Sequence, residues 1–389
     1  MAPGCPNRHD GPVNAPAALA RNPHLDRVRG VATLGILGMN SISFGLPVPA
    51  YWNVGYAGSD TPLDLAVGLL GEVFLDQKMM GLFSLLFGAS LVLYLDRIST
   101  RSKRPVRRSL WRNALLLGMG MVHSAFWEGD VLLVYALCAP VVLLLRKLPP
   151  RLLLGLGLGT VGLSALLGFG LQEEVTASGA TSLGWYWSEP EGRMPEAWEL
   201  IVIGDFFLRA IGMMLVGVWA LRRGWFESDA PARVLRRAAS WGLGLGVLLA
   251  AAGALLAWSE DYAVTVAFDA AGLNTLATPL FTIGLLASIL LWSRGQGSAA
   301  SEGLKERLGA VGRMALTNYL SQTVLGLVIL RHVLELGSLG RTELMLFTLA
   351  VGGLQLLWSP LWFRRFAMGP LEWLWRSVTD LRPARLLRA

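Results

Sequence analysis

Ten apolar stretches, each close to 20 residues long, recur along this chain of 389 residues. An α-helix of about 20 apolar residues crosses the ~30 Å hydrocarbon core of a bilayer. Hydrophobic residues make up 53% of the chain and charged residues 16%, which is too apolar for a soluble core. We therefore expect an all-α fold, a polytopic membrane helix bundle of about ten transmembrane helices. The stretches lie at approximately 29–47, 77–96, 109–127, 131–147, 152–171, 199–221, 239–258, 270–292, 314–333 and 344–363.

The positions of the cations predict how the bundle is oriented. Lys and Arg are retained on the cytoplasmic side of short loops. With the N-terminus inside, 29 of the 34 Lys and Arg residues fall on the inner side, so we predict an N-in, C-in topology. The net charge of +7 then reflects basic loops beside anionic membrane lipids, and no nucleic-acid partner is expected.

Three parts of the chain are expected: a disordered cytoplasmic tail at 1–24, a single transmembrane domain at 25–376 and a basic cytoplasmic tail at 377–389. Segment 64–75 is interpreted as an amphipathic or re-entrant helix at the outer face, ahead of a span that starts near Lys78. The glycine run at 242–246 lies in an apolar span and follows no strand, which favours helix packing over phosphate binding.

The largest outer loop, Gln172 to Trp198, is acidic and aromatic. Its aromatic rings suit either a lid that stacks on a sugar or a belt at the lipid interface, and the belt is the favoured interpretation.

His123 lies inside the third stretch and is followed by Glu128 and Asp130 at the next turn. Histidine is the side chain best matched to proton transfer near neutral pH, and either acid could orient its ring. The alternative is a histidine that only bonds a neighbouring helix. Ionisable residues inside a membrane mark functional sites by default, so His123, Glu128 and Asp130 are candidate catalytic residues.

The first two spans carry further polar residues. Asp26 can cap the first helix and pair with Arg29 one turn later, while Asn40 places an amide deep in the span and can also act as a helix–helix bond. Lys78 can bind an anion, neutralise an oxyanion or pair with Asp76.

Two later spans also contain polar groups. Arg209 can pair with Asp205 on one helix face, either as a structural ion pair or as a clamp for a carboxylate or phosphate. Asn318 and Gln322 belong to a polar face that is either a contact between helices or a cavity wall. The four histidines lie far apart in the sequence and have no partner at metal-ligand spacing, so no metal site is expected.

Five segments together resemble a known family. Residues 25–40, 78–88, 123–130, 312–322 and 369–376 are similar, in order, to those of the YeiB-like family of bacterial inner-membrane proteins. The resemblance implies a multi-pass protein of the bacterial inner membrane. That family is distantly similar to membrane acyltransferases of the heparan-glucosaminide acetyltransferase type, most clearly at Asp26, Arg29, Gly30 and Asn40.

The leading hypothesis is transfer of an acyl group from a thioester donor to a hydroxyl or amine of an envelope or exported molecule, a small molecule or a glycan. His123 would be the general base, Asp130 or Glu128 would orient it, and Asn40 or Lys78 would stabilise the oxyanion. Acyl-CoA would be a co-substrate, with no bound cofactor, and its phosphates would meet inner-face arginines, especially Arg104, Arg107 and Arg108.

Two alternatives belong to other classes. A transporter or exporter of a small anionic or amphiphilic solute would use Lys78, Arg209 and the polar face at Asn318. An accessory subunit would have no activity of its own.

Overall fold

The computed structural model describes residues 22–388, so the predicted tail at 1–24 lies, up to residue 21, outside the described residues. Within this range the chain is helical, and its one β-bridge joins Phe366 to Leu387 in isolation. The predicted all-α fold is confirmed. The helices are α1 (Pro23–Gly45), α2 (Pro49–Trp52), α3 (Pro62–Phe74), α4 (Lys78–Ser99), α5 (Pro105–Ser124), α6 (Leu132–Leu145), α7 (Pro150–Ser178), η1 (Gly184–Tyr186), α8 (Glu196–Arg222), α9 (Ala232–Ser259), η2 (Val264–Val266), α10 (Ala267–Arg294), α11 (Ala299–Arg313), α12 (Ala315–Gly326), the π-helix η3 (Leu327–Val333), α13 (Arg341–Trp362) and α14 (Pro370–Asp380).

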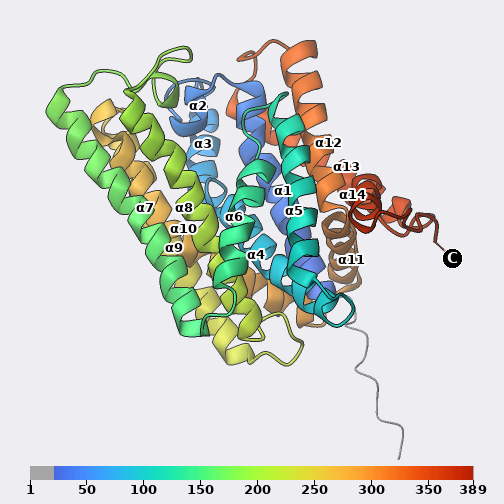
Figure 1. Ribbon diagram of the computed structural model, residues 1–389. Helices are drawn as coiled ribbons and strands as arrows, with labels where there is room; N and C mark the ends of the chain where they lie inside the picture. Colours follow the sequence, from blue (N-terminus) through green and yellow to red (C-terminus); the bar gives the residue numbers. More distant parts are fainter. Residues whose placement is uncertain (1–21, 389) are drawn as a thin grey trace, which may run out of the picture.

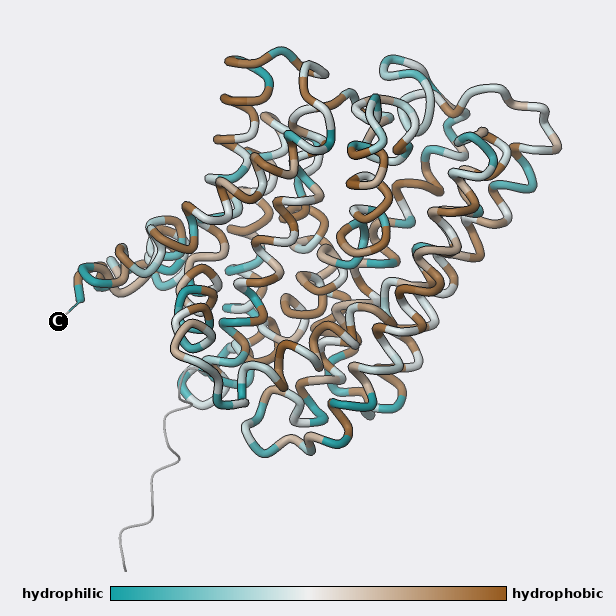
Figure 2. The backbone as a smooth tube through the Cα atoms, turned by 180° about the vertical axis from the view of Figure 1, so that it is seen from behind, coloured by the Kyte–Doolittle hydropathy of each residue, from teal (hydrophilic) through white to brown (hydrophobic). Residues whose placement is uncertain are grey.

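The long helices form a bundle with two sides (Figure 1). On one side α7 packs along α8 and α9 packs along α10, and on the other α1 packs against α11, α12 and α13. Helices α4 and α6 lie between the two sides and both contact α8. Figure 2 shows hydrophobic residues along the helices and hydrophilic ones mostly at their ends. We call the end at which α1 begins and α4 ends the basic end of the bundle.

Six apolar helical segments are long and apolar enough to cross a membrane, so the chain is a helical membrane protein. The four other predicted stretches are helical as well, in α1, α5, α6 and α12 with η3. Helix α6 is shorter, with 14 residues, and the others carry more polar residues because their buried faces line the interior described below. The six segments are Pro62–Ser99, Pro150–Ser178, Glu196–Arg222, Ala232–Ser259, Val264–Arg294 and Arg341–Trp362.

The segment predicted as an amphipathic or re-entrant helix ahead of a span near Lys78 is the helix α3. Helix α3 packs against α9 and α13 and leads into α4 through a break at 75–77, with α4 starting at Lys78 as expected. Gln77 at the break has φ +58°, in the left-handed region that interrupts a helix. The buried side chain of Val73 packs with alanines of α9 and α10, whereas Leu63, Leu70 and Phe74 are exposed, so α3 is the partly buried first section of a discontinuous helix.

Close contact between α9 and α10 explains the glycine run at 242–246. A Cβ atom on Gly242 would lie 2.6 Å from the carbonyl oxygen of Leu280, and one on Gly246 would lie 2.6 Å from the backbone nitrogen of Phe281. The absence of side chains lets the two backbones touch, as predicted.

The aromatic loop between α7 and α8 is neither an open lid nor a lipid-facing belt. Tyr186 is buried, and its ring stacks on Trp52, 5.2 Å away, and on Phe268, 4.9 Å away. Trp187 is also buried and donates from its indole to the carbonyl of Tyr262. These rings pack on one another, which leaves their faces unavailable to stack on a sugar.

The segment predicted as a basic tail from residue 377 begins within a helix. Helix α14 continues to Asp380 and packs against α5 and α12 at the basic end. The chain then folds back so that the backbone N–H of Arg388 donates to the carbonyl of Arg365, just past α13.

Candidate functional site

His123 and Asp130 form a buried pair at the junction of α5 and α6. His123 lies in the last turn of α5, and its Nδ1 atom is 2.7 Å from Oδ1 of Asp130. The other carboxylate oxygen of Asp130 accepts a 2.9 Å hydrogen bond from the backbone N–H of Leu133, in the first turn of α6. The carboxylate is therefore held at two points, and it fixes the orientation of the imidazole.

The second ring nitrogen of His123 is free. Nε2 is buried and has no hydrogen-bond partner among the described residues. The ring lies edge-on to Trp127 and Tyr319, with centroids 5.8 Å and 5.4 Å away. Because a carboxylate at Nδ1 accepts the proton there, we assign that tautomer, which leaves Nε2 as a base.

Tyr319 is a member of this site that the sequence interpretation missed. It is 1% exposed, and its hydroxyl donates to Oδ1 of Asp130 over 3.4 Å. Tyr319 lies in α12, within the polar stretch that drew attention to Asn318 and Gln322. A tyrosine inside such a stretch is the signal that could have identified it.

Glu128 does not join the pair. Its side chain is exposed, whereas Asp130 is buried against His123. Of the two acids, only Asp130 has the geometry to orient the histidine. Asn40 is buried in α1, and its amide has no hydrogen-bond partner within residues 22–388, which leaves the amide N–H groups free to donate.

Lys78 is held at the break between α3 and α4. Its ammonium donates to the carbonyl of Glu72 over 2.6 Å and to the side-chain oxygen of Asn274. The amide of Asn274 in turn donates to Asp76 over 2.7 Å. The lysine is 0% exposed and belongs to a polar network that joins the break to α10.

Arg209 forms the predicted ion pair with Asp205 on α8, and Ser164 of α7 donates to the same aspartate. The guanidinium carbon also lies 4.9 Å from the ring centroid of Phe206. Of the two interpretations, a structural ion pair and a clamp for an anion, this arrangement matches the structural ion pair.

The polar face of α12 joins helices to one another. Asn318 donates to the carbonyl of Val311 and to Ser359, each over 3.2 Å. Gln322 donates to the carbonyl of Thr33 over 3.1 Å and to Gln355 over 2.8 Å. These bonds link α12 to α1, α11 and α13. Of the two interpretations of this face, a contact between helices and a cavity wall, the bonds fit the contact between helices.

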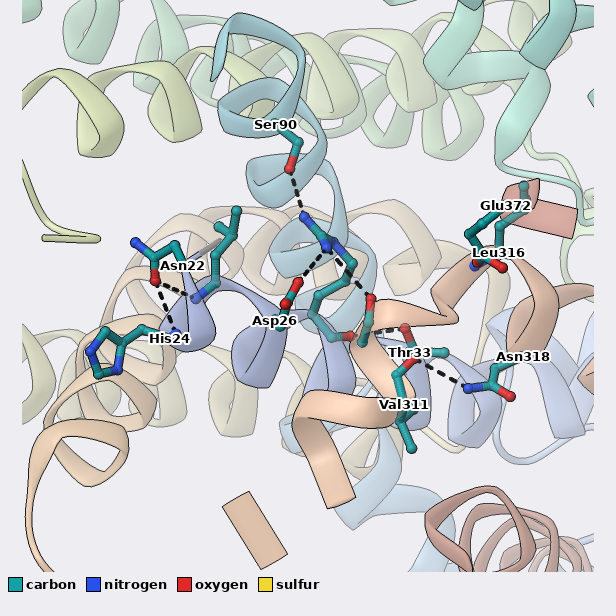
Figure 3. A network of polar contacts seen from close by, with 12 residues as sticks. Asn22, His24, Asp26, Thr33, Ser90, Val311, Leu316, Asn318 and Glu372 are labelled. Atoms are coloured by element: carbon teal, nitrogen blue, oxygen red, sulfur yellow. Dashed lines mark hydrogen bonds and ion pairs between the residues drawn. The ribbon is translucent and has the colours of Figure 1, made fainter. Parts of the chain in front are cut away.

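Asp26 and Arg29 meet near the start of α1. Arg29 donates to Asp26 over 3.0 Å and to the hydroxyl of Ser90 on α4 over 3.0 Å (Figure 3). The predicted cap was wrong, because the side chain of Asn22 accepts the backbone N–H groups of His24 and Leu25. Asn22 comes first in the chain and reaches the free N–H groups of the first turn, so Asp26 remains available to Arg29.

A cavity of about 230 Å³, here called the central cavity, lies between α4, α5 and α12. Tyr319 forms part of its wall. Most other wall residues are apolar, among them Phe83, Leu86, Phe87, Leu91, Leu116 and Leu132.

A second cavity of about 650 Å³, here called the arginine vestibule, adjoins the first at the basic end. Six residues line both cavities, and Arg112 is one of them. Its guanidinium carbon lies 4.3 Å from the ring centroid of Tyr94 and 4.0 Å from that of Trp375. The side chain therefore marks the passage between the two cavities.

The arginine vestibule carries an excess of positive charge, with six arginines against three acids, Asp26, Glu372 and Asp380. Of the three predicted inner-face arginines only Arg108 lines it, paired with Asp380 over 2.6 Å. Arg104 and Arg107 are exposed and do not line either cavity. The arginines of the lining are Arg29, Arg97, Arg101, Arg108, Arg112 and Arg376.

Glu372 of α14 lies at the junction of the two cavities. Its carboxylate accepts the backbone N–H groups of Leu316 and Thr317 and the hydroxyl of Thr317, so it caps the start of α12. Burial raises the pKa of this carboxyl above its usual value, against the opposing effect of these hydrogen bonds. No group of three His, Cys, Asp or Glu side chains suited to a metal ion occurs among residues 22–388.

These features define a helical membrane protein with a buried His–Asp pair beside cavities that lead from a basic surface. Comparison with known proteins gives the family of the chain. The chain belongs to the YeiB-like DUF418 family: the family model described as "Protein of unknown function (DUF418)" matches residues 220–382, and a full-length relative supports the assignment. That relative, "Uncharacterized protein YeiB" of Escherichia coli (strain K12), is 34% identical over 93% of this chain and 97% of its own length.

Two relatives from other bacteria are similar over nearly the same extent. "Uncharacterized protein YxaH" of Bacillus subtilis (strain 168) is 29% identical, covering 92% of this chain and 94% of the relative. An "Uncharacterized 39.9 kDa protein in amylase 3'region" of Bacillus acidopullulyticus is 26% identical, covering 93% and 95%. The predicted family is thus confirmed, and the names of these relatives specify no activity.

Proposed function

We propose that this protein transfers an acyl group from a thioester donor to a hydroxyl or amine of an envelope or exported acceptor. One observation carries the proposal: the buried His123–Asp130 pair, with Nε2 unpartnered, lies behind Tyr319 at the wall of a cavity that continues to an arginine-rich surface. A base, an apolar chamber and an anion-binding entrance are the three parts that such a transfer requires.

The donor would enter at the basic end, which on the positive-inside rule would face the cytoplasm of a bacterial inner membrane. Arginine binds phosphate groups through paired N–H donors, so the vestibule suits the phosphates of an acyl-CoA co-substrate. The apolar wall of the central cavity suits the acyl end of the donor. The part of the donor that joins its phosphates to its acyl end would then pass Arg112.

His123 would act as the general base. Its Nε2 accepts the proton of the acceptor hydroxyl or amine while the acceptor oxygen or nitrogen bonds to the thioester carbonyl carbon. The tetrahedral intermediate collapses with cleavage of the carbon–sulfur bond, and the imidazolium returns the proton to the leaving thiolate. Asp130 stabilises the imidazolium between these two events.

The negative charge on the carbonyl oxygen requires a hydrogen-bond donor. Asn40 is the candidate that remains, because its amide is buried and unpartnered, whereas Lys78 is bound to Glu72 and Asn274. Lys78 and Arg209 were the cations expected to line a transport path. Because Lys78 is bound to Glu72 and Asn274 and Arg209 is paired with Asp205, a transport path has less support.

The proposal is tested with protein purified in detergent, radiolabelled acetyl-CoA and a crude envelope extract. Wild type is compared with His123→Ala and with His332→Ala, whose histidine is exposed on η3. We expect transfer of label that falls by at least about 10²-fold in His123→Ala and is retained in His332→Ala. No transfer by wild type with several acyl donors, or equal transfer by all three proteins, would refute the proposal.

A further inference from the structure

Tyr319 lies between the central cavity and His123. Its ring belongs to the wall of the central cavity, and it also lies edge-on to His123 with centroids 5.4 Å apart. Its hydroxyl accepts the backbone N–H of Val131 and donates to Asp130, each over 3.4 Å. One side chain therefore contacts the cavity and both members of the pair.

The cavity itself stops short of the histidine. Leu116, Leu132 and Tyr319 line it on the side towards the α5–α6 junction, whereas His123 and Asp130 do not line it. The Nε2 atom of His123 is buried and unpartnered. In the arrangement described, a donor that fills the central cavity would meet the tyrosine ring before it met the base.

We propose that Tyr319 is the positioning residue that separates the donor cavity from His123 and admits the acyl carbonyl to Nε2 only when its ring turns aside. This inference rests on the proposed acyl transfer. The two hydrogen bonds that hold the ring are longer than the usual range of about 2.7 to 3.2 Å, so they are weak.

Such a barrier has a chemical use. With the ring in place, the histidine is shielded from the aqueous vestibule, so a bound thioester is not exposed to base-activated water before the acceptor arrives. The hydroxyl at the same time restrains the carboxylate that orients the histidine. Both effects come from the same residue, but they can be separated because Tyr319→Phe removes only the hydroxyl.

The test measures access to His123 without any acyl donor. Protein in lipid nanodiscs is treated with diethyl pyrocarbonate, which acylates unprotonated imidazole, and modification of each histidine is followed by mass spectrometry. Tyr319→Ala is compared with wild type, Tyr319→Phe and Phe87→Ala. Phe87 is the matched control, because it lines the same cavity and contacts Tyr135 rather than His123.

We expect the modification rate of His123 to rise by about tenfold or more in Tyr319→Ala and to stay within about twofold of wild type in Tyr319→Phe and Phe87→Ala. The exposed His332 provides the internal reference rate. An unchanged His123 rate in Tyr319→Ala, or an equal rise in Phe87→Ala, would overturn the proposal. If Tyr319→Ala does not purify as a folded protein, Tyr319→Leu is measured against the same limits.

The labelling result and the turnover result are independent. Protection of His123 by Tyr319 without any acyl transfer would refute the proposed function and leave the barrier in place. Acyl transfer with no change in labelling would support the function and refute the barrier.

Discussion

The Nδ1 atom of His123 lies 2.7 Å from Oδ1 of Asp130, and the opposite nitrogen of the same ring has no hydrogen-bond partner in the described part of the chain. This relationship is what the proposed role as a base requires, because one nitrogen is oriented by a carboxylate and the other is available to accept a proton. The pair is therefore the part of the molecule on which tests of chemistry should concentrate.

Replacing Asp130 with Asn keeps the shape of the side chain but removes the charge that stabilises a protonated His123. We expect the rate of acyl transfer at saturating substrate to fall by about 10²-fold or more, measured with radiolabelled donor. Glu128→Gln is the matched control, since Glu128 is two residues away and exposed. Similar losses in both variants would contradict the assignment of Asp130.

Arg112 lies in the passage between the arginine vestibule and the central cavity, stacked between Tyr94 and Trp375. We expect Arg112→Ala to raise KM for an acyl-CoA donor by about tenfold, equivalent to ~1.4 kcal/mol of binding, with less than about a threefold change in kcat. Steady-state kinetics at varied donor concentration measure both. Arg107→Ala, an exposed position on the same helix, should leave KM unchanged; an equal rise there would indicate a general effect of surface charge.

Glu372 provides a test through the pH dependence of stability. Burial raises its pKa above the usual value, so folding favours the protonated form. The stabilising contribution is complete below the ordinary carboxyl pKa and is lost as pH rises through the raised one. Glu372→Gln should remove this decline, so the difference in thermal midpoint between variant and wild type should change as the pH rises above the ordinary carboxyl pKa of about 4.3. Glu343→Gln, an exposed acid on α13, is the control, and parallel curves for Glu372→Gln and wild type would rule out the assignment.

Lys78 is the cation at the centre of the network that joins the break in the α3–α4 segment to α10. Lys78→Met removes the positive charge beside Asp76 and Asn274. Removing one partner from a buried charged network lowers the free energy of unfolding by about 3–5 kcal/mol. We expect a clear fall in the thermal midpoint in detergent. The exposed Lys147→Met serves as the control. An unchanged midpoint in Lys78→Met would show that the network does not stabilise the fold.

Contacts between residues close in sequence were within reach of prediction. Asp26 and Arg29 are one turn apart on a helix, and His123 and Asp130 lie on either side of a single turn. Helix geometry brings the first pair together, and the short turn between α5 and α6 keeps the second pair close in the chain. The order and approximate position of the helices also followed from the sequence, because a bilayer requires long apolar helices whatever their arrangement.

Contacts between distant residues depended on how the helices pack. Tyr319 meets Asp130 across 189 residues, Lys78 meets Asn274 across 196, and Trp375 meets Arg112 across 263. Local sequence cannot encode which faces of two remote helices come together, so Tyr319, Arg112 and the two cavities were not foreseen. The choice of Asp130 over Glu128 depended on packing for the same reason.

The sequence by itself determined that this chain is a helical membrane protein with a basic face and a histidine near two acids, because hydropathy, charge and helical spacing are local properties. The tertiary structure decided which acid holds the histidine, which polar residues only join helices, and where the cavities lie. Those outcomes depend on side-chain packing between helices, which sets the distances on which hydrogen bonding and chemistry depend.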